Sequence, residues 1–200
     1  MIRLYHSPRT RSIRILWLLE ELGLPFELVS IEYRPPATPF AQRTPSGKFP
    51  TLEDGDTVMF ESGAIVEYLL ERHGRGRLGP RAGEPGRGAY LQWLHFAEAT
   101  LMPPLIEILR HTLLKPEAQR IPAVVDDAKI RAAATLDVLE RALQDRDYVP
   151  GTDFSAADIM MGYGVQWAAA MGLLTNSPNL RAYNERLSSR PALQKALAAT

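Results

Sequence analysis

The amino-acid sequence predicts a small α/β domain followed by an all-helical domain. Up to about residue 73, strand-like alternation and helix-like spacing of apolar residues follow one another. Residues 74–88, with six glycines and two prolines, then interrupt the pattern. Beyond them, apolar residues recur at helical spacing alone. We therefore place the α/β domain at residues 1–76, a linker at 77–87 and the helical domain at 88–200.

The α/β domain opens with a strand–helix–strand unit. Residues 2–6 alternate like a strand, and a wide apolar surface indicates a helix over residues 11–22. Gly23 and Pro25 end this helix, and residues 27–31 form a second strand. Because a crossover of this kind is almost always right-handed, we expect the two strands to run parallel in one sheet.

A hairpin and a second helix complete this domain. Residues 33–50 hold five prolines, so we expect only one or two irregular helical turns there. Residues 51–53 and 57–61 are predicted strands, joined by an Asp-Gly-Asp turn. Ser62 is the expected N-cap of a helix that continues to about His73.

The second domain is predicted to be a helical bundle. At the start of its third segment, Ser155 and Asp158 match the S-x-x-D form of a capping box, so we interpret Asp158 as structural and not catalytic. The five expected segments are approximately residues 88–113, 123–144, 156–171, 178–189 and 191–199.

Composition disfavours several classes of function. Lys and Arg number 23, as do Asp and Glu, so the chain lacks the basic excess typical of nucleic-acid binding. With no cysteine there is no disulfide, no cysteine-ligated zinc site and no thiol nucleophile from the protein. The four histidines lack metal-ligand spacing, and we expect no metal. The chain has neither the apolar core of a signal peptide nor a membrane-spanning run, which indicates a cytoplasmic protein.

Groups suited to one kind of ligand are concentrated around the predicted hairpin. Pro50 holds Phe49 in an extended shape, whose backbone can pair with a peptide. The helix N-terminus at Ser62 can bind a carboxylate, and the neighbouring Glu61 can bind an ammonium group. A small zwitterionic peptide would match these three features together.

Four motifs follow one another along nearly the whole chain: Ser7-Pro8 with Arg14, Gly47-Lys48-Phe49-Pro50, Glu61-Ser62 with Ala64-Ile65, and Phe154-Ser155-Ala156-Ala157-Asp158-Ile159. In this order they resemble the motifs of the glutathione S-transferase family. The resemblance implies that the α/β domain is thioredoxin-like and that the helical domain lines an apolar electrophile pocket, with Met102, Leu105, Trp167 and Met171 as candidates. It also implies glutathione as co-substrate and a homodimer.

The same resemblance implies where glutathione binds. The backbone of Phe49, exposed by a cis bond to Pro50, would pair with the cysteinyl part. Ser62 would bind the γ-glutamyl carboxylate and Glu61 the ammonium group. Lys48 would meet the glycyl carboxylate.

The group that activates the thiol is expected at the N-terminus of the first helix. A free thiol is mostly protonated at neutral pH, and a hydroxyl that donates to sulfur stabilises the thiolate. Thr10, Ser12 and Ser7 are the candidates, and families with a catalytic serine place it at Thr10. Arg11 occupies the position of the cysteine in a bacterial class and is a further candidate, together with backbone N–H groups.

The resemblance implies conjugation of the glutathione thiolate to a small apolar electrophile, a detoxification reaction. Two alternatives stay open at this point. One is a glutathione-dependent disulfide reductase or peroxidase that needs no protein cysteine. The other is a non-catalytic protein that binds glutathione or another ligand.

Overall fold

The computed structural model describes residues 1–32 and 47–199 and divides into two compact units. The first unit runs from Met1 to Arg81 and also includes the C-terminal residues from Ser188. The second comprises Ala82–Leu187. Most of the proline-rich stretch, for which irregular turns were expected, lies outside the described residues.

The first unit is built on a four-stranded mixed sheet with strand order β2-β1-β3-β4. Its strands are β1 (Ile2–His6), β2 (Phe26–Ser30), β3 (Thr51–Asp54) and β4 (Thr57–Phe60). Strands β1 and β2 are parallel and the other pairs antiparallel, as the crossover and the hairpin predicted. Predicted and observed strand ends differ by at most one residue.

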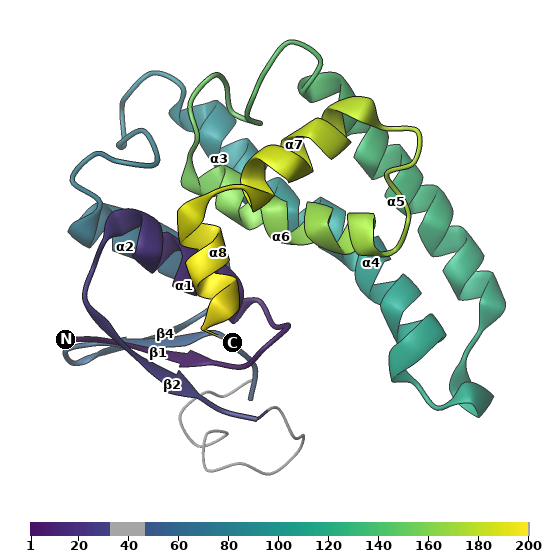
Figure 1. Ribbon diagram of the computed structural model, residues 1–200, viewed down its shortest axis with the longest axis horizontal. Coiled ribbons are helices and arrows are strands. Elements are labelled where there is room, and N and C mark those ends of the chain that lie inside the picture. The colour runs from purple at the N-terminus through teal and green to yellow at the C-terminus, as the bar shows by residue number, and fades with distance from the viewer. Residues whose placement is uncertain (33–46, 200) are drawn as a thin grey trace. The chain divides into compact units, whose positions relative to one another are not determined.

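Helices α1 (Ser12–Leu22) and α2 (Ser62–His73) cover one face of this sheet (Figure 1). Almost every residue of α1 is buried, because the helix lies between the sheet and helix α8 (Pro191–Ala198). The core between sheet and helices is formed by fully buried aliphatic side chains, among them Leu4, Ile15, Leu16, Leu18, Leu19, Leu52, Ile65 and Leu69.

A partly buried ion pair connects helix α8 to α1. Both guanidinium nitrogens Nε and Nη2 of Arg190 donate to the Glu21 carboxylate, at 2.6 and 2.9 Å. The Trp17 indole N–H donates to the same carboxylate at 2.9 Å. The last helix therefore belongs to the sheet-containing unit. From the helical spacing of its apolar residues, we had expected it to belong to the helical domain at residues 88–200.

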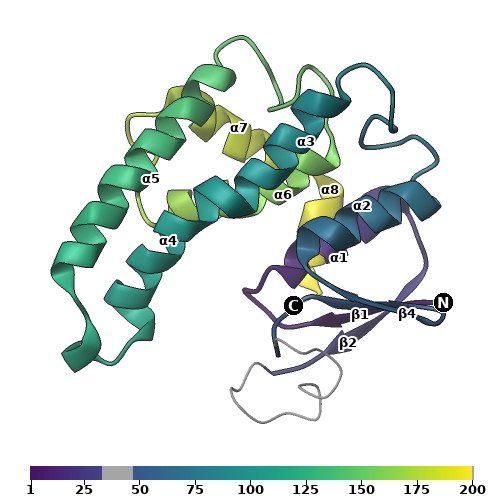
Figure 2. The ribbon, with the colours of Figure 1, turned by 180° about the vertical axis from the view of Figure 1, so that it is seen from behind.

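The second unit is entirely helical in its regular elements. Figure 2 shows α3 and α4 following one another along one long path, with α5 beside α4. This path corresponds to the single helix predicted over residues 88–113, but π-helical turns interrupt it. Pro103 and Pro104 supply no backbone N–H to the carbonyls of residues 99 and 100. The regular α-helical hydrogen bonding is therefore broken in the first of these turns, Ala97–Leu101. The elements are α3 (Arg87–Phe96), η2 (Ala97–Leu101), α4 (Met102–Leu109), η3 (Arg110–Leu114), η4 (Glu117–Gln119), α5 (Pro122–Ala142), α6 (Ala156–Ala170) and α7 (Pro178–Ser188).

The predicted capping box starts α6, a helix with buried residues on nearly all sides. The fully buried Asp158 accepts from the Ser155 backbone N–H, the Val149 N–H and the Tyr183 hydroxyl, each at 2.9 Å. Burial raises the pKa of this carboxyl. The predicted capping box of Ser155 and Asp158 is confirmed. In the part of the chain that the structure describes, no helix has the length and apolarity to cross a membrane.

Candidate functional site

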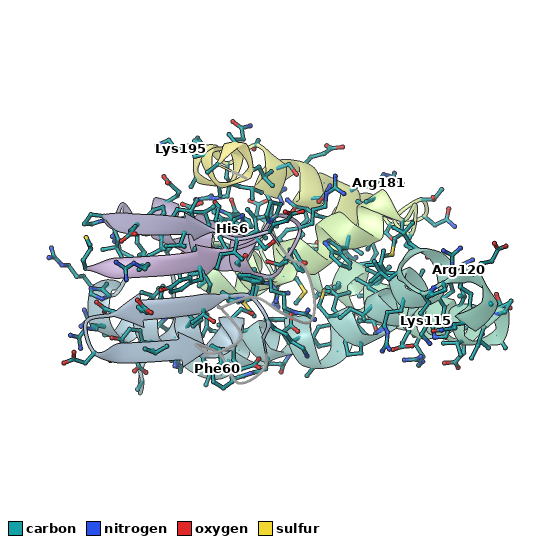
Figure 3. All side chains as sticks on the ribbon, turned by 90° about the horizontal axis from the view of Figure 1, so that it is seen from below. His6, Phe60, Lys115, Arg120, Arg181 and Lys195 are labelled. Carbon is teal, nitrogen blue, oxygen red and sulfur yellow. The ribbon has the colours of Figure 1, made fainter. Side chains whose placement is uncertain are left out.

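The strand register brings the predicted site residues to one edge of the sheet. Tyr5 of β1 pairs with Thr51 of β3, and Thr51 pairs with Phe60 of β4, both in antiparallel fashion. The end of β1, the beginning of β3 and the end of β4 therefore lie together, and Figure 3 labels His6 and Phe60 at this end. The N-terminus of α2 follows the end of β4 after one residue, and that of α1 follows the end of β1 after a loop of residues 7–11.

The loop between β1 and α1 contains a chain of hydrogen-bonded hydroxyls. Thr10 Oγ1 lies 2.7 Å from Ser12 Oγ and donates to the Ser7 carbonyl, also at 2.7 Å. Ser12 Oγ lies 2.9 Å from Nδ1 of His6. His6 and Ser12 are fully buried and Ser7 nearly so, whereas Thr10 is half-exposed. Of the three hydroxyl candidates, Thr10 is thus the one a ligand can reach.

Arg11 stands at the N-cap of α1, so the helix begins one residue later than predicted. Its side chain makes no capping hydrogen bond and is half-exposed. The backbone N–H of Ser12 is 3.4 Å from Thr10 Oγ1, which therefore provides the side-chain interaction at this helix end. The N-terminal turn is accordingly shaped by Thr10 and Ser12 together.

The segment before β3 is buried at Phe49 and Pro50. The Phe49–Pro50 peptide bond is cis, as the family resemblance implied. The Phe49 side chain is buried with Tyr5, against the half-buried Val29 and Ile31. Lys48 is exposed, and Gly47 before it has a φ of 61°, a conformation that favours glycine.

The prediction that Ser62 is the N-cap of α2 was wrong by one residue. Glu61 occupies the N-cap, because its carbonyl accepts the first helical hydrogen bond from the Ile65 N–H at 3.0 Å. Ser62 is the first residue of the helix and is buried. Glu61 has φ 74° and ψ 109°, a backbone conformation rare for a residue with a side chain and concentrated at ligand sites in proteins. Its side chain is exposed.

Arg14 connects the two helix N-termini. It is fully buried on α1, and its Nη1 donates to the Ser62 hydroxyl at 3.2 Å. A buried guanidinium next to Ser62 adds positive charge to an edge where two helix N-termini already favour anions. The sequence singled out Arg14 only as part of a motif; its position among apolar residues of α1 was the available signal.

His6 was not singled out by the sequence. It had been grouped with histidines that lack metal-ligand spacing, yet it is fully buried and contacts the hydroxyl chain. Burial lowers its pKa, so the imidazole is held neutral. Its place two residues after Leu4, on the core-facing side of β1, is the signal that could have indicated burial.

The remaining candidates lie in the second unit or concern metals. Met102 and Leu105 are fully buried, which makes them part of the core of that unit, whereas Trp167 and Met171 are half-buried. Among the residues that the structure describes, no three or more of His, Cys, Asp and Glu are grouped to hold a metal ion.

A mixed four-stranded sheet with this edge site, followed by a helical unit, is the two-part architecture of a thioredoxin-like domain joined to a helical domain. The model for the N-terminal domain of glutathione S-transferases matches residues 4–81, and the model for their C-terminal domain matches residues 122–186. The chain belongs to the glutathione S-transferase family.

Individual relatives match nearly the whole chain. Glutathione S-transferase 3 of Schizosaccharomyces pombe is 30% identical and covers 98% of this chain and 86% of its own length. The disulfide-bond oxidoreductase YfcG of Escherichia coli is also 30% identical, covering 98% of this chain and 94% of its own. The crystal structure of a glutathione transferase from Methylococcus capsulatus superposes with a TM-score of 0.88, at 27% identity over 100% of this chain and 98% of that one.

Proposed function

We propose that the chain binds glutathione at the edge of its sheet and transfers the glutathione thiolate to a small apolar electrophile. The observation that carries this proposal is the half-exposed Thr10 hydroxyl at the start of α1, on the edge that also holds Phe49 and Ser62. Its hydroxyl is available to a sulfur atom bound there.

Each end of glutathione has a matching group. The backbone of Phe49 pairs with the cysteinyl part, as a strand edge pairs with a peptide. The α2 N-terminus at Ser62, with Arg14 behind it, receives the γ-glutamyl carboxylate. The exposed Glu61 binds the ammonium group and Lys48 the glycyl carboxylate.

The chemical step requires ionised sulfur. The Thr10 hydroxyl and the N-terminus of α1 stabilise the thiolate, so the thiol releases its proton to solvent near neutral pH. Arg11 adds positive charge to the same helix end. The sulfur then attacks the electrophilic carbon, a C–S bond forms, and either a leaving group departs with its electron pair or the adduct takes up a proton.

A disulfide reductase is the second candidate, favoured by the name of the Escherichia coli relative. In that reaction one glutathione thiolate attacks a disulfide and displaces a thiolate, and a second glutathione resolves the mixed disulfide. No protein thiol takes part, which agrees with the absence of cysteine. Conjugation and reduction are distinguished by whether the product is a thioether or oxidised glutathione.

Two further properties are proposed from the family resemblance: a homodimer and a cytoplasmic location. Sedimentation equilibrium tests the first, and a mass of one chain (22.3 kDa) at micromolar concentration would contradict it.

The decisive experiment is a glutathione titration. Calorimetry measures the binding affinity, and the ultraviolet absorbance of the thiolate across pH measures the thiol pKa of bound glutathione. Binding with a thiol pKa well below the free value supports an enzyme, and a panel of aryl halides, epoxides and mixed disulfides then separates the two reactions. Binding with an unshifted pKa indicates a non-catalytic binding protein. Absence of binding rejects the proposed site.

A further inference from the structure

A buried histidine, His6, ends the hydroxyl chain before α1, at the opposite end of this chain from the half-exposed Thr10. We propose that His6 is a positioning residue, whose Nδ1–H, acting through Ser12, leaves the Thr10 proton available to the glutathione sulfur. This inference rests on the proposed function, because Thr10 is assigned there to the thiolate. His6 itself does not touch the substrate.

The argument begins with the hydrogen bonds of Ser12. Its oxygen is 2.9 Å from His6 Nδ1 and 2.7 Å from Thr10 Oγ1. It also accepts from the Ser7 backbone N–H at 3.3 Å and lies 3.3 Å from the Ser7 carbonyl. A hydroxyl has one proton and two lone pairs, so Ser12 can satisfy only three of these four contacts at once, and its single proton goes either to an acceptor at 2.7–2.9 Å or to the more distant Ser7 carbonyl.

The position of the proton on the His6 ring determines which hydroxyl donates and which accepts in the hydroxyl chain. If His6 carries its proton on Nδ1, that N–H and the Ser7 N–H occupy both lone pairs of Ser12. Thr10 then cannot donate to Ser12; instead it accepts the Ser12 proton across the 2.7 Å contact. The Thr10 proton is directed to the Ser7 carbonyl, and rotation about the Cβ–Oγ1 bond turns it to a sulfur.

The other tautomer reverses the His6–Ser12 and Ser12–Thr10 hydrogen bonds. If the proton is on Nε2, Ser12 must donate to Nδ1 of His6, and Thr10 must donate to Ser12. Thr10 would then present only lone pairs outward, which repel a thiolate. The two tautomers therefore correspond to an active and an inactive direction of the Thr10 hydroxyl.

The surroundings of His6 favour the active direction. Its Nε2 is buried and has no hydrogen-bond partner among the residues that the structure describes. A buried N–H donor without a partner is rarer in proteins than an unsatisfied acceptor, so the proton belongs on Nδ1. A second proton on the ring is opposed by burial, which lowers the pKa of His6. A neutral Nδ1–H imidazole results.

Three variants test the role of His6. His6→Leu fills the space but removes the donor. His6→Asn places an amide N–H near the position of Nδ1 and should restore the donor. Thr10→Val removes the terminal hydroxyl itself. Its effect on the thiol pKa is therefore the largest that disruption of the hydroxyl chain can produce.

The primary readout is the thiol pKa of bound glutathione, from thiolate absorbance, with calorimetric affinity measured in parallel. We expect His6→Leu to raise that pKa, with about a tenfold smaller ratio of thiolate to thiol at neutral pH, because a hydrogen bond to a charged group is worth about ten- to hundredfold. His6→Asn should regain most of the loss, and affinity should change little in both. An unshifted pKa in His6→Leu, or an Asn variant no better than Leu, would overturn the inference.

A second measurement does not depend on glutathione. The ¹⁵N chemical shifts of the His6 ring in the free protein distinguish the tautomers, and we expect the Nδ1–H form. The Nε2–H form would overturn the inference even if His6→Leu failed to fold. If the wild-type protein does not bind glutathione, the proposed function fails, and the tautomer spectrum alone decides the direction of the hydroxyl chain.

Discussion

Arg14 and Ser62, 48 residues apart in sequence, are joined by a buried hydrogen bond between the first turns of α1 and α2. The guanidinium Nη1 donates to the serine hydroxyl at 3.2 Å, and both side chains are buried. The contact connects the helix that follows the proposed thiol-activating hydroxyl of Thr10 to the helix proposed to bind the γ-glutamyl carboxylate.

A double-mutant cycle on this pair should reveal coupling. Arg14→Leu and Ser62→Ala are each expected to lower the free energy of unfolding by about 1–3 kcal/mol, because each leaves a buried polar group without this partner. The double variant should lose less than the sum, with a coupling of about 0.5–3 kcal/mol. Urea unfolding of the four proteins provides the measurement. Additive losses would show that the two side chains do not interact energetically.

Thr10→Val should reduce kcat/KM for conjugation by about ten- to hundredfold, the value of one hydrogen bond to a charged group. Thr10→Ser keeps the hydroxyl and should retain most activity. Ser7→Ala is the matched control, because the hydroxyl chain uses the Ser7 backbone groups and not its side chain. Steady-state kinetics decide the matter, and equal losses in the Thr10→Val and Ser7→Ala enzymes would remove Thr10 from its proposed role.

Stability in acid should depend on Asp54, at the far end of β3 from the site. His73 Nε2 donates to its carboxylate at 2.8 Å, and the Tyr68 hydroxyl donates at 3.0 Å; with Arg72 nearby, these contacts hold the pKa of Asp54 below its usual value of 3.8. The folded chain thus binds this proton less readily than the unfolded chain. Its contribution to stability is present above the unfolded pKa and is lost as pH falls through the folded pKa.

The free energy of unfolding should therefore fall less steeply below about pH 4 in Asp54→Asn than in the wild type. Urea unfolding at a series of pH values between about 2.5 and 6 measures the two slopes. At neutral pH the variant should be the less stable protein, because the charged acceptor is gone. Parallel curves across the acid range would contradict the assigned role of Asp54.

Gly164→Ala should destabilise the helical unit. A Cβ at this position of α6 would lie 2.6 Å from Cδ2 of the fully buried Leu101, so the core must shift, at a cost of about 1–3 kcal/mol. Gly88→Ala, in α3, is the control: its Cβ meets no atom within 4 Å. That substitution should stabilise the helix by up to about 1 kcal/mol. Thermal unfolding compares the two, and equal effects would contradict this packing argument.

Local patterns in the sequence determined the elements of the first unit. Alternation over residues 2–6, the Asp-Gly-Asp turn and the apolar period of the helices each depend on neighbours within a few residues, so they are legible without a structure. The same holds for the capping box of Ser155 and Asp158. The order of the motifs was sufficient to indicate the family, and it also selected the residues that lie at the edge of the sheet.

Only the tertiary structure decided which side chains meet. The contact of Arg14 with Ser62 depends on strand register and helix packing, which local periodicity does not specify. The place of α8 beside α1 depends on the pair Arg190 and Glu21, 169 residues apart. The fold buries His6 against Ser12, and its proposed role depends on this contact. The chemical role of a histidine in a strand can be judged only when its neighbours are known.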